Sequence, residues 1–497
     1  MTAVDKLFPA SPAFERRGFM LDVSRDRVPT RETIAWLIDV LAALRFNELQ
    51  LYVEHTFAYA DHEVVWRDAS PLTHDDMAWI ARRGAEQGVD LVANMNGFGH
   101  MARWLIHDEY RDRAECPDGA PKVFGDGLID PTCLAPTEAN AELAVALARE
   151  MLGAVGGDRI HIGGDEPFEL GEGLSADRVA EFGRDRVYLD HLNRIIEPLV
   201  ADGTEVLFWA DLFRRDHTLM ADIPTRATGV VWHYEAPSQT SFLDFLPTEI
   251  AARLGLPDDA NLGFEAHARL FIDSDTPFWV APGTATWNTI LGRNQNAAAN
   301  VVDAAAVGAA HGAQGYLLTD WGDNGHWQPL AVSLPSMVRA ATAAWHGGAT
   351  DPDVGPVIDE LVGADAGTGQ LLDTLGHLGE TLGLTAPNGS PVFAALVDTN
   401  LPTFGQLDES ALARARTTVD EAEQAFADEP FGGPRGAIIA AEMVAACGLA
   451  RLGLRRLAGD EPSGDEIDAA RAVQREAWLQ SSRPGGLDDS VAKLRRP

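Results

Sequence analysis

The chain has 497 residues, of which 46% are hydrophobic and 23% charged, a globular composition that excludes a disordered or fibrous protein. Its 75 acidic and 39 basic side chains give a formal charge of −36. Such a surface repels phosphate backbones and anionic membranes, so we expect neither nucleic acid nor membrane as a partner.

Eight short apolar runs recur through the first two-thirds of the chain, and most are followed by a helical segment. After the first run, Ile34, Leu37, Ile38 and Leu41 share one helical stripe, with Thr30 as a plausible N-cap. Further helices are expected over residues 77–87 and 138–152. The predicted strands are residues 18–23, 48–53, 89–95, 159–163, 205–210, 228–233, 277–282 and 315–320.

Continuous apolar strands that alternate with helices predict a parallel sheet covered on its outer face. Eight such units favour an α/β fold, a (β/α)₈ TIM barrel over residues 1–345. A doubly wound open sheet is the rival fold, but no Gly-rich phosphate loop follows any of the strands.

From about residue 346 the sequence becomes rich in Ala, Leu, Glu and Arg and has no strand-like run. Long helices are expected over residues 411–426 and 436–457, within a helical C-terminal domain of residues 346–497. These helices are expected to pack on the barrel or to form the interface of a homodimer.

The targeting and cysteine patterns favour a cytoplasmic protein. The N-terminal segment has no basic region followed by a long apolar run, and no window approaches 18 uncharged apolar residues. The three cysteines, Cys116, Cys133 and Cys447, form no CxxC pair, so we expect neither a disulfide framework nor a thiolate zinc site.

In a (β/α)₈ barrel the chemistry lies at the C-terminal ends of the strands, and polar or aromatic residues follow nearly every predicted strand. Indole faces stack on a pyranose ring while carboxylates bind its hydroxyl groups, so this mixture predicts a sugar pocket. The residues in question are Asp22 and Arg25, Glu54 and His55, His100, His161, Asp165 and Glu166, Trp209 and Asp211, Trp232 and Tyr234, Trp287, and Trp321 and Asp323.

Asp165 and Glu166 are adjacent in the sequence, which disfavours a pair that flanks a sugar ring from both faces. They suit a different mechanism, in which Glu166 is the general acid and Asp165 holds a substrate group that itself acts as the nucleophile.

Two other classes of function remain open. A metal-dependent barrel hydrolase would need ligands such as His55, His100 and His161 with Asp165, although the chain has no HxH or HExxH motif. A non-catalytic amino-sugar-binding protein could keep the same pocket. We expect no cofactor and no metal.

Three segments resemble glycoside hydrolase family 20, the β-N-acetylhexosaminidases. They are RGFMLDVSR (residues 17–25), HIGGDE (161–166) and TDWGDNG (319–325), in the family's order along the barrel. The resemblance covers about residues 14–345 and is closest to the compact, intracellular, exo-acting bacterial branch.

The resemblance implies an exo-β-N-acetylhexosaminidase that releases terminal GlcNAc or GalNAc with retention through an oxazolinium intermediate. Glu166 would be the general acid and then the base, while Asp165 would orient the 2-acetamido group. An ionised Asp165 would favour the protonated form of Glu166.

The same resemblance assigns substrate-binding roles around this pair. Arg17 would bind the sugar's 3- and 4-hydroxyls, His100 would occupy the family's histidine turn, and Asp323 would bind the outer hydroxyls. Trp321 would form the base of the pocket, and Trp209 and Trp232 would enclose the acetamido methyl group.

Two departures from the family pattern affect the expected site. Glu54-His55-Thr56 replaces two acidic residues after the second strand, so His55 could pair with Asp165 or Glu166. After the seventh strand Trp287 stands where the family has a tyrosine, and Tyr234 is expected to bind the acetamido carbonyl instead. Asp211 and Trp287 are expected as aglycone or rim contacts.

Overall fold

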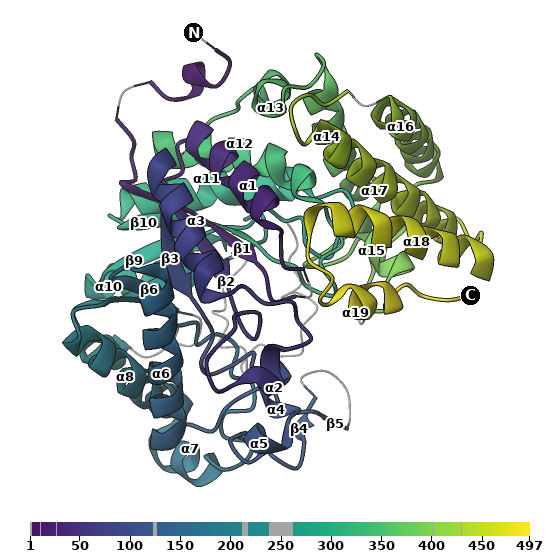
Figure 1. The fold of residues 1–497 in the computed structure, drawn as a ribbon. Helices are drawn as coiled ribbons and strands as arrows, with labels where there is room; N and C mark the ends of the chain where they lie inside the picture. Colours follow the sequence, from purple (N-terminus) through teal and green to yellow (C-terminus); the bar gives the residue numbers. More distant parts are fainter. Residues whose placement is uncertain are drawn as a thin grey trace.

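The computed structural model describes residues 2–9, 11–25, 27–122, 127–210, 217–237, 262–399, 401–428 and 430–497. Eight parallel strands close into a barrel, in the order β1-β10-β9-β8-β7-β6-β3-β2 (Figure 1). The strands are β1 (Arg16–Asp22), β2 (Glu48–Tyr52), β3 (Asp90–Asn94), β6 (Arg159–His161), β7 (Glu205–Trp209), β8 (Ala227–Trp232), β9 (Phe278–Ala281) and β10 (Gly315–Asp320). The predicted (β/α)₈ barrel and all eight of its strands are confirmed, with ends that shift by at most a few residues.

Closure occurs between the first and last strands, where Gly18 pairs with Leu317 and Met20 with Thr319. On the other side of β1, Gly18 pairs with Glu48 of β2. A Cβ at Gly18 would lie 2.7 Å from Leu317 Cδ1, so the absence of a side chain lets the two strands approach.

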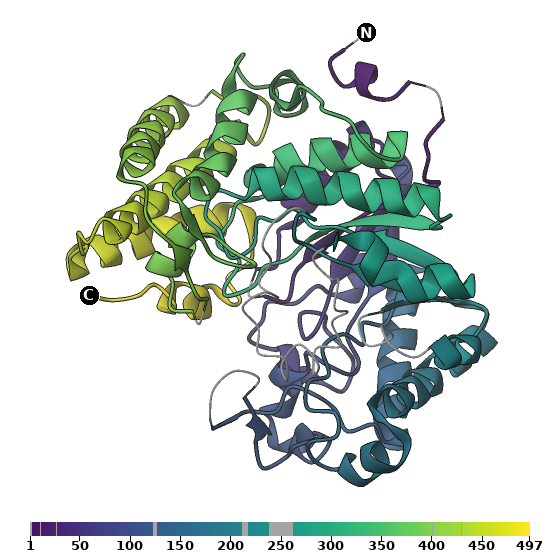
Figure 2. The same cartoon turned by 180° about the vertical axis from the view of Figure 1, so that it is seen from behind.

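Helices cover the outside of the barrel, and consecutive ones pack side by side around it (Figures 1 and 2). Thr30 caps the first of them as predicted, since its hydroxyl accepts a hydrogen bond from Thr33 N. The surrounding helices are α1 (Arg31–Ala43), α3 (His74–Gln87), α6 (Glu138–Val155), α8 (Arg184–Ala201), α10 (Phe264–Ser274), α11 (Asn294–Ala310) and α12 (Leu330–His346).

Short elements occupy the loops that follow the strands, together with a 3-10 turn near the N-terminus. They are η1 (Asp5–Leu7), α2 (Glu63–Trp66), α4 (Ala102–Leu105), α5 (Asp108–Arg111), β4 (Ala120–Pro121), β5 (Leu128–Ile129), α7 (Ala176–Phe182) and η2 (His217–Asp222).

The C-terminal region is mainly helical and packs beside the barrel, with α13 and α14 against α12 (Figure 2). A two-stranded antiparallel pair, β11 with β12, corrects the expectation that this region has no strand. Its elements are α13 (Val354–Val362), α14 (Thr368–His377), η5 (Leu378–Thr381), β11 (Leu384–Thr385), α15 (Pro391–Leu396), β12 (Phe404–Gly405), α16 (Glu409–Ala427), α17 (Gly436–Leu457), α18 (Gly464–Ser481) and α19 (Leu487–Ala492).

Helix α17 is the centre of this region and contacts α15, α16 and α18. By length and composition it could cross a membrane, but 67% of its apolar window is buried inside the structure. Its apolar residues therefore serve as core, and Leu449 belongs to the same continuous cluster as Leu334 of α12 and Leu51 of β2. The division at residue 345 remains a prediction.

Candidate active site

The loop after β6 presents Asp165 and Glu166 at the C-terminal end of the barrel. It turns sharply, with φ of 71° at Gly163 and 92° at Gly164. A Cβ on Gly163 would lie 2.6 Å from Asn96 Cγ, so the first glycine lets the loop press against Asn96. Glu166 itself has a φ of 48°, an uncommon backbone conformation for a residue other than glycine, and its carboxylate lies near the same His100 nitrogen as that of Asp165.

Asp165 is buried and held from two sides. Its Oδ1 accepts a 2.6 Å hydrogen bond from Asn96 Nδ2, and its Oδ2 lies 3.1 Å from His100 Nε2. Burial alone would raise the pKa of this carboxyl, but the charges of His100 and Arg25 outweigh it and hold the pKa below its ordinary value. Asp165 is therefore an oriented carboxylate.

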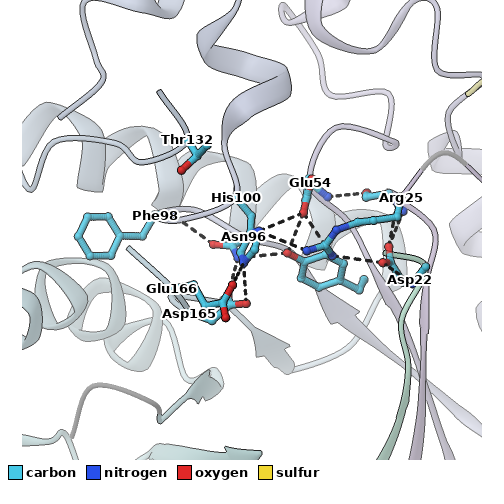
Figure 3. Close-up of polar contacts among 12 residues, drawn as sticks. Asp22, Arg25, Glu54, Asn96, Phe98, His100, Thr132, Asp165 and Glu166 are labelled. Atoms are coloured by element: carbon cyan, nitrogen blue, oxygen red, sulfur yellow. Dashed lines mark hydrogen bonds and ion pairs between the residues drawn. The ribbon is translucent and has the colours of Figure 1, made fainter. Parts of the chain in front are cut away.

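His100 lies between the two carboxylates and the rest of the cluster (Figure 3). Its Nε2 is 3.4 Å from Glu166 Oε2, and its Nδ1 is 3.2 Å from Arg25 Nη2. Burial favours the neutral ring, yet the adjacent carboxylates raise the pKa of His100 well above its ordinary value. The preceding Gly99 packs against the loop, since a Cβ there would lie 2.2 Å from Asp165 O.

Arg25 carries the cationic end of the cluster. Its Nη1 lies 3.2 Å from Asp22 Oδ2 and 3.3 Å from Glu54 Oε1. The guanidinium is also placed 5.0 Å from the ring centre of Tyr52 and 5.1 Å from that of Trp321. Burial would lower the pKa of Arg25, but Glu54 and Asp22 raise it well above its ordinary value.

Glu54 joins Arg25 to the histidine. Tyr52 donates a 3.1 Å hydrogen bond to Glu54 Oε1, which is 3.8 Å from His100 Nδ1. Burial raises the pKa of Glu54, against the opposing charges of Arg25 and His100. The single acidic residue after β2 thus supplies an acid–histidine–carboxylate chain through Glu54, His100 and Asp165.

The expected role of Arg17 is wrong. Arg17 lies near the N-terminal end of β1, the opposite end of the barrel from Asp165. Its guanidinium donates to the backbone carbonyls of Phe14, Glu15 and Arg45. Arg25, at the C-terminal end of the same strand segment, occupies the pocket instead.

The expected pairing of His55 with Asp165 or Glu166 is also wrong. Glu54 faces the cluster, whereas His55 lines a separate cavity of about 160 Å³ with Arg103 and Asp489. Burial, assisted by nearby arginine charges, lowers the pKa of His55 to about 3, so its ring is neutral.

Aromatic side chains form the wall of the pocket. Trp321 packs edge-on to Tyr52 at 4.8 Å and donates from Nε1 to the Tyr234 hydroxyl at 2.9 Å. Tyr234 stacks on Trp232 at 5.2 Å and meets Trp287 edge-on at 5.0 Å. These rings make a polar–aromatic wall suited to the apolar face of a sugar.

Deeper in the barrel, Trp209 is fully buried and its Nε1 has no hydrogen-bond partner among the described residues. It packs on His161 with ring centres 4.3 Å apart. His161 is kept neutral by burial, which lowers its pKa to about 3, and its Nδ1 accepts from Gly163 N. His161 therefore supports the turn beneath Asp165.

Two predicted substrate-binding residues, Asp323 and Trp287, follow the last strands. Asp323 is half-buried, and burial raises the pKa of its carboxyl although Arg25 opposes the shift. Trp287 is buried and donates from Nε1 to Asn388 Oδ1 at 2.8 Å, so the C-terminal region contacts the pocket wall. Asp211 lies outside the described residues.

The contributions of Asn96 and Asn388 to this site were not predicted, and Arg25 was expected at its strand end without an assigned role. Asn96 follows the C-terminal end of its strand, so its position alone could have selected it, as it selected Arg25. Nothing near Asn388 in the sequence signals its contact with Trp287, because 101 positions separate the two. Among the described residues, no three His, Cys, Asp or Glu side chains are grouped so as to hold a metal ion.

The chain is similar to known glycoside hydrolases. Residues 14–243 match the model of the glycosyl hydrolase family 20 catalytic domain. Human hexosaminidase D is 23% identical over 369 residues, covering 71% of this chain and 70% of the relative. The match to the family model ends before β9, so Trp287, Trp321 and Asp323 lie beyond it.

A solved chitobiase structure shares the fold. The chitobiase of Flavobacterium johnsoniae superposes with a TM-score of 0.52 at 12% identity, over 94% of this chain and 78% of that one. The family 20 β-N-acetylhexosaminidase of Streptomyces coelicolor gives 0.49 at 17% identity, over 71% and 70%.

The chain is therefore a glycoside hydrolase built on a (β/α)₈ barrel. Over residues 14–243 the chain is similar to the catalytic domain of glycosyl hydrolase family 20, as the segments at 17–25 and 161–166 indicated, and the third segment, at 319–325, lies beyond this match.

Proposed function

We propose that the protein is an exo-β-N-acetylhexosaminidase that removes terminal β-linked GlcNAc or GalNAc. The observation that carries this proposal is the oriented carboxylate of Asp165, fixed by Asn96 and His100 beside the more exposed carboxyl of Glu166. The similarity to human hexosaminidase D supports the same substrate class.

In the proposed mechanism the substrate supplies the nucleophile. The acetamido oxygen attacks the anomeric carbon while Glu166 donates its proton to the glycosidic oxygen, whose bond to that carbon breaks. Asp165 accepts a hydrogen bond from the acetamido N–H and stabilises the cationic oxazolinium ring. Glu166 then removes a proton from the water that opens this ring, so configuration is retained.

The remaining groups bind the sugar. Arg25 and Asp323 are proposed to bind ring hydroxyls. Arg25 remains cationic, and its charge acts on the carboxyl of Asp323. Tyr234 is proposed to donate to the acetamido carbonyl, and Trp209, Trp232 and Trp321 to enclose its methyl group. We also propose a cytoplasmic location, which three unpaired, buried cysteines support because reducing compartments keep thiols free.

The first test is release of p-nitrophenol from the β-GlcNAc and β-GalNAc glycosides, with the β-glucoside as control. We expect hydrolysis of an amino sugar but not of the glucoside, which lacks the acetamido nucleophile. Hydrolysis of the glucoside at a similar rate would contradict substrate assistance.

Glu166→Gln tests the acid. Loss of general acid catalysis costs about 10²–10⁴-fold, and less where the leaving group needs no proton. We expect a larger loss of kcat on a GlcNAc disaccharide than on the p-nitrophenyl glycoside. Glu172→Gln, an exposed residue nearby in the same loop, is the matched control. Equal losses on both substrates would reject Glu166 as the acid.

A further inference from the structure

A small cavity lies between the barrel and the C-terminal helices, behind the loop that carries Trp321 and Asp323. Its volume is about 20 Å³, enough for one water-sized or monatomic occupant. Its charged and amide- or imidazole-bearing lining residues are Arg27, His326, Gln328, Arg435 and Glu442, and hydroxyl side chains such as that of Ser481 complete the polar lining.

Arg435 is the unusual member of this lining. It is only 9% exposed, and its Nε and Nη1 atoms are buried with no hydrogen-bond acceptor among the described residues. Its guanidinium lies 5.6 Å from the ring centre of Trp36, which offsets part of the cost of burying the charge. A buried cation whose donors are unpaired nevertheless carries a large desolvation penalty.

The other arginine of the cavity is fully paired. Arg27 Nη2 donates to Glu442 Oε1 at 2.7 Å and to Ser481 Oγ at 3.0 Å, and Nη1 donates to Gln328 O at 3.2 Å. Glu442 therefore makes its ion pair with Arg27, and although its charge also acts on Arg435, no carboxylate of the described residues forms an ion pair with Arg435.

The remaining groups around the cavity leave this balance unchanged. His326 is neutral, because burial and the charge of Arg27 lower its pKa to about 3. Glu32 acts on the charge of Arg435 from an exposed position on α1. Arg435 is also the N-cap residue of the 22-residue helix α17 and gives it no side-chain cap, so the positive end of that helix faces the same region.

We propose that this cavity binds one monatomic, monovalent anion of chloride's size, with Arg435 as its principal ligand. One negative charge neutralises a lining whose formal charge is otherwise +1, from Arg27 and Arg435 against Glu442. The small volume excludes a carboxylate or a phosphate. The anion fixes the start of α17 against the loop in which Gln328 Nε2 donates to Trp321 O at 2.7 Å.

Bromide replaces chloride in such sites and scatters anomalously, so it reports the occupant directly. Crystals of the wild-type protein grown in sodium bromide should show an anomalous difference peak within reach of Arg435 Nε and Nη1. A cavity that holds only a water molecule in these crystals would overturn the proposal.

Thermal unfolding provides a second test of anion binding, in solution. An anion that binds only the folded state raises the midpoint with the logarithm of its concentration, by about 2 °C for each tenfold increase. We compare chloride with gluconate, which is too large for the cavity, at equal ionic strength. Arg435→Gln should abolish the difference, whereas Arg451→Gln, which changes a partly exposed arginine of the same helix, should keep it.

Each outcome decides the question. Equal wild-type midpoints in chloride and gluconate would overturn the proposal, as would an Arg435→Gln protein that retains the full chloride dependence. If Arg435→Gln does not fold, the bromide crystals and the wild-type comparison still decide it.

Discussion

Arg25 and Arg17 lie at opposite ends of the first strand segment, and one substitution at each distinguishes a pocket residue from a structural one. Lysine keeps the charge but cannot contact Asp22, Glu54 and His100 together as the guanidinium does. We expect Arg25→Lys to lower kcat/KM for the amino-sugar glycoside by about 10–100-fold, equivalent to about 1.4–2.7 kcal/mol.

Arg17→Lys is the matched control for this measurement. It loses hydrogen bonds to three backbone carbonyls, so the midpoint of thermal unfolding should fall. Its kcat/KM should stay within about twofold of wild type because Arg17 is far from the strand ends that carry the chemistry. A larger catalytic loss at Arg17 than at Arg25 would restore the assignment made from the sequence.

His100 should control the acid limb of the pH–activity profile. The pKa of Asp165 is held below its ordinary value, so the ionised form is present at neutral pH and is lost as pH falls through the folded-state pKa. His100→Gln removes the neighbouring cation, which raises that pKa. The acid limb of kcat/KM should therefore move to higher pH, and the stability that Asp165 contributes should be lost at higher pH as well.

The profile of His311→Gln, which changes an exposed histidine after α11, gives the control and should match wild type. An unmoved acid limb in His100→Gln would show that His100 does not set the charge state of the reacting carboxylates.

The strands could be predicted from the sequence because each is a short, nearly continuous apolar run, as parallel strands buried on both faces require. Helix ends were less well predicted: α6 continues to Val155, where Gly156 in a left-handed conformation ends it. Placing residues at strand ends selected Glu54, His100, Asp165 and Glu166. It could not reveal that Glu54 faces the carboxylate cluster while His55 lines a separate cavity, because that depends on the turn of the chain after β2.

The contact of Asn388 with the pocket wall was also beyond sequence reasoning, and it yields a prediction about the C-terminal region. Asn388 has a φ of 54°, and its Oδ1 accepts from Trp287 Nε1. Asn388→Gly keeps this backbone conformation while removing the acceptor. We expect Trp287 to loosen against Tyr234, raising KM for the amino-sugar glycoside about threefold to tenfold with a smaller change in kcat.

Asn388→Asp supplies the rescue, because a carboxylate oxygen can still accept from the indole. Its KM should lie closer to wild type than that of the glycine variant. If both variants keep the wild-type KM, the C-terminal region has no part in substrate binding.

At the scale of the whole molecule, the barrel and the C-terminal helices share one apolar cluster, which includes Leu51, Leu334 and Leu449. A buried ion pair crosses the same boundary, with Arg27 Nη2 2.7 Å from Glu442 Oε1. Two parts joined by a shared core and a buried charge pair should unfold together, even though their sequences differ in character.

Glu442→Ala tests this coupling. Removing one partner of a buried pair leaves the other charge uncompensated and costs about 3–5 kcal/mol, whereas breaking an exposed pair costs about 0–1 kcal/mol. Asp420→Ala, which breaks the exposed pair with Arg451 on α17, is therefore the matched control.

We expect Glu442→Ala to lower the unfolding midpoint well below that of Asp420→Ala. Helicity by circular dichroism and hydrolytic activity should be lost over the same temperature range, because both tryptophans of the site are connected to the C-terminal region. Trp287 donates a hydrogen bond to Asn388. Trp321 is connected to Glu442 through hydrogen bonds of Gln328 and Arg27. An early loss of helicity that left the barrel active would mean that the two parts fold independently. The shared core would then be an interface between two stable domains, and residues 346–497 could be removed without destroying the site.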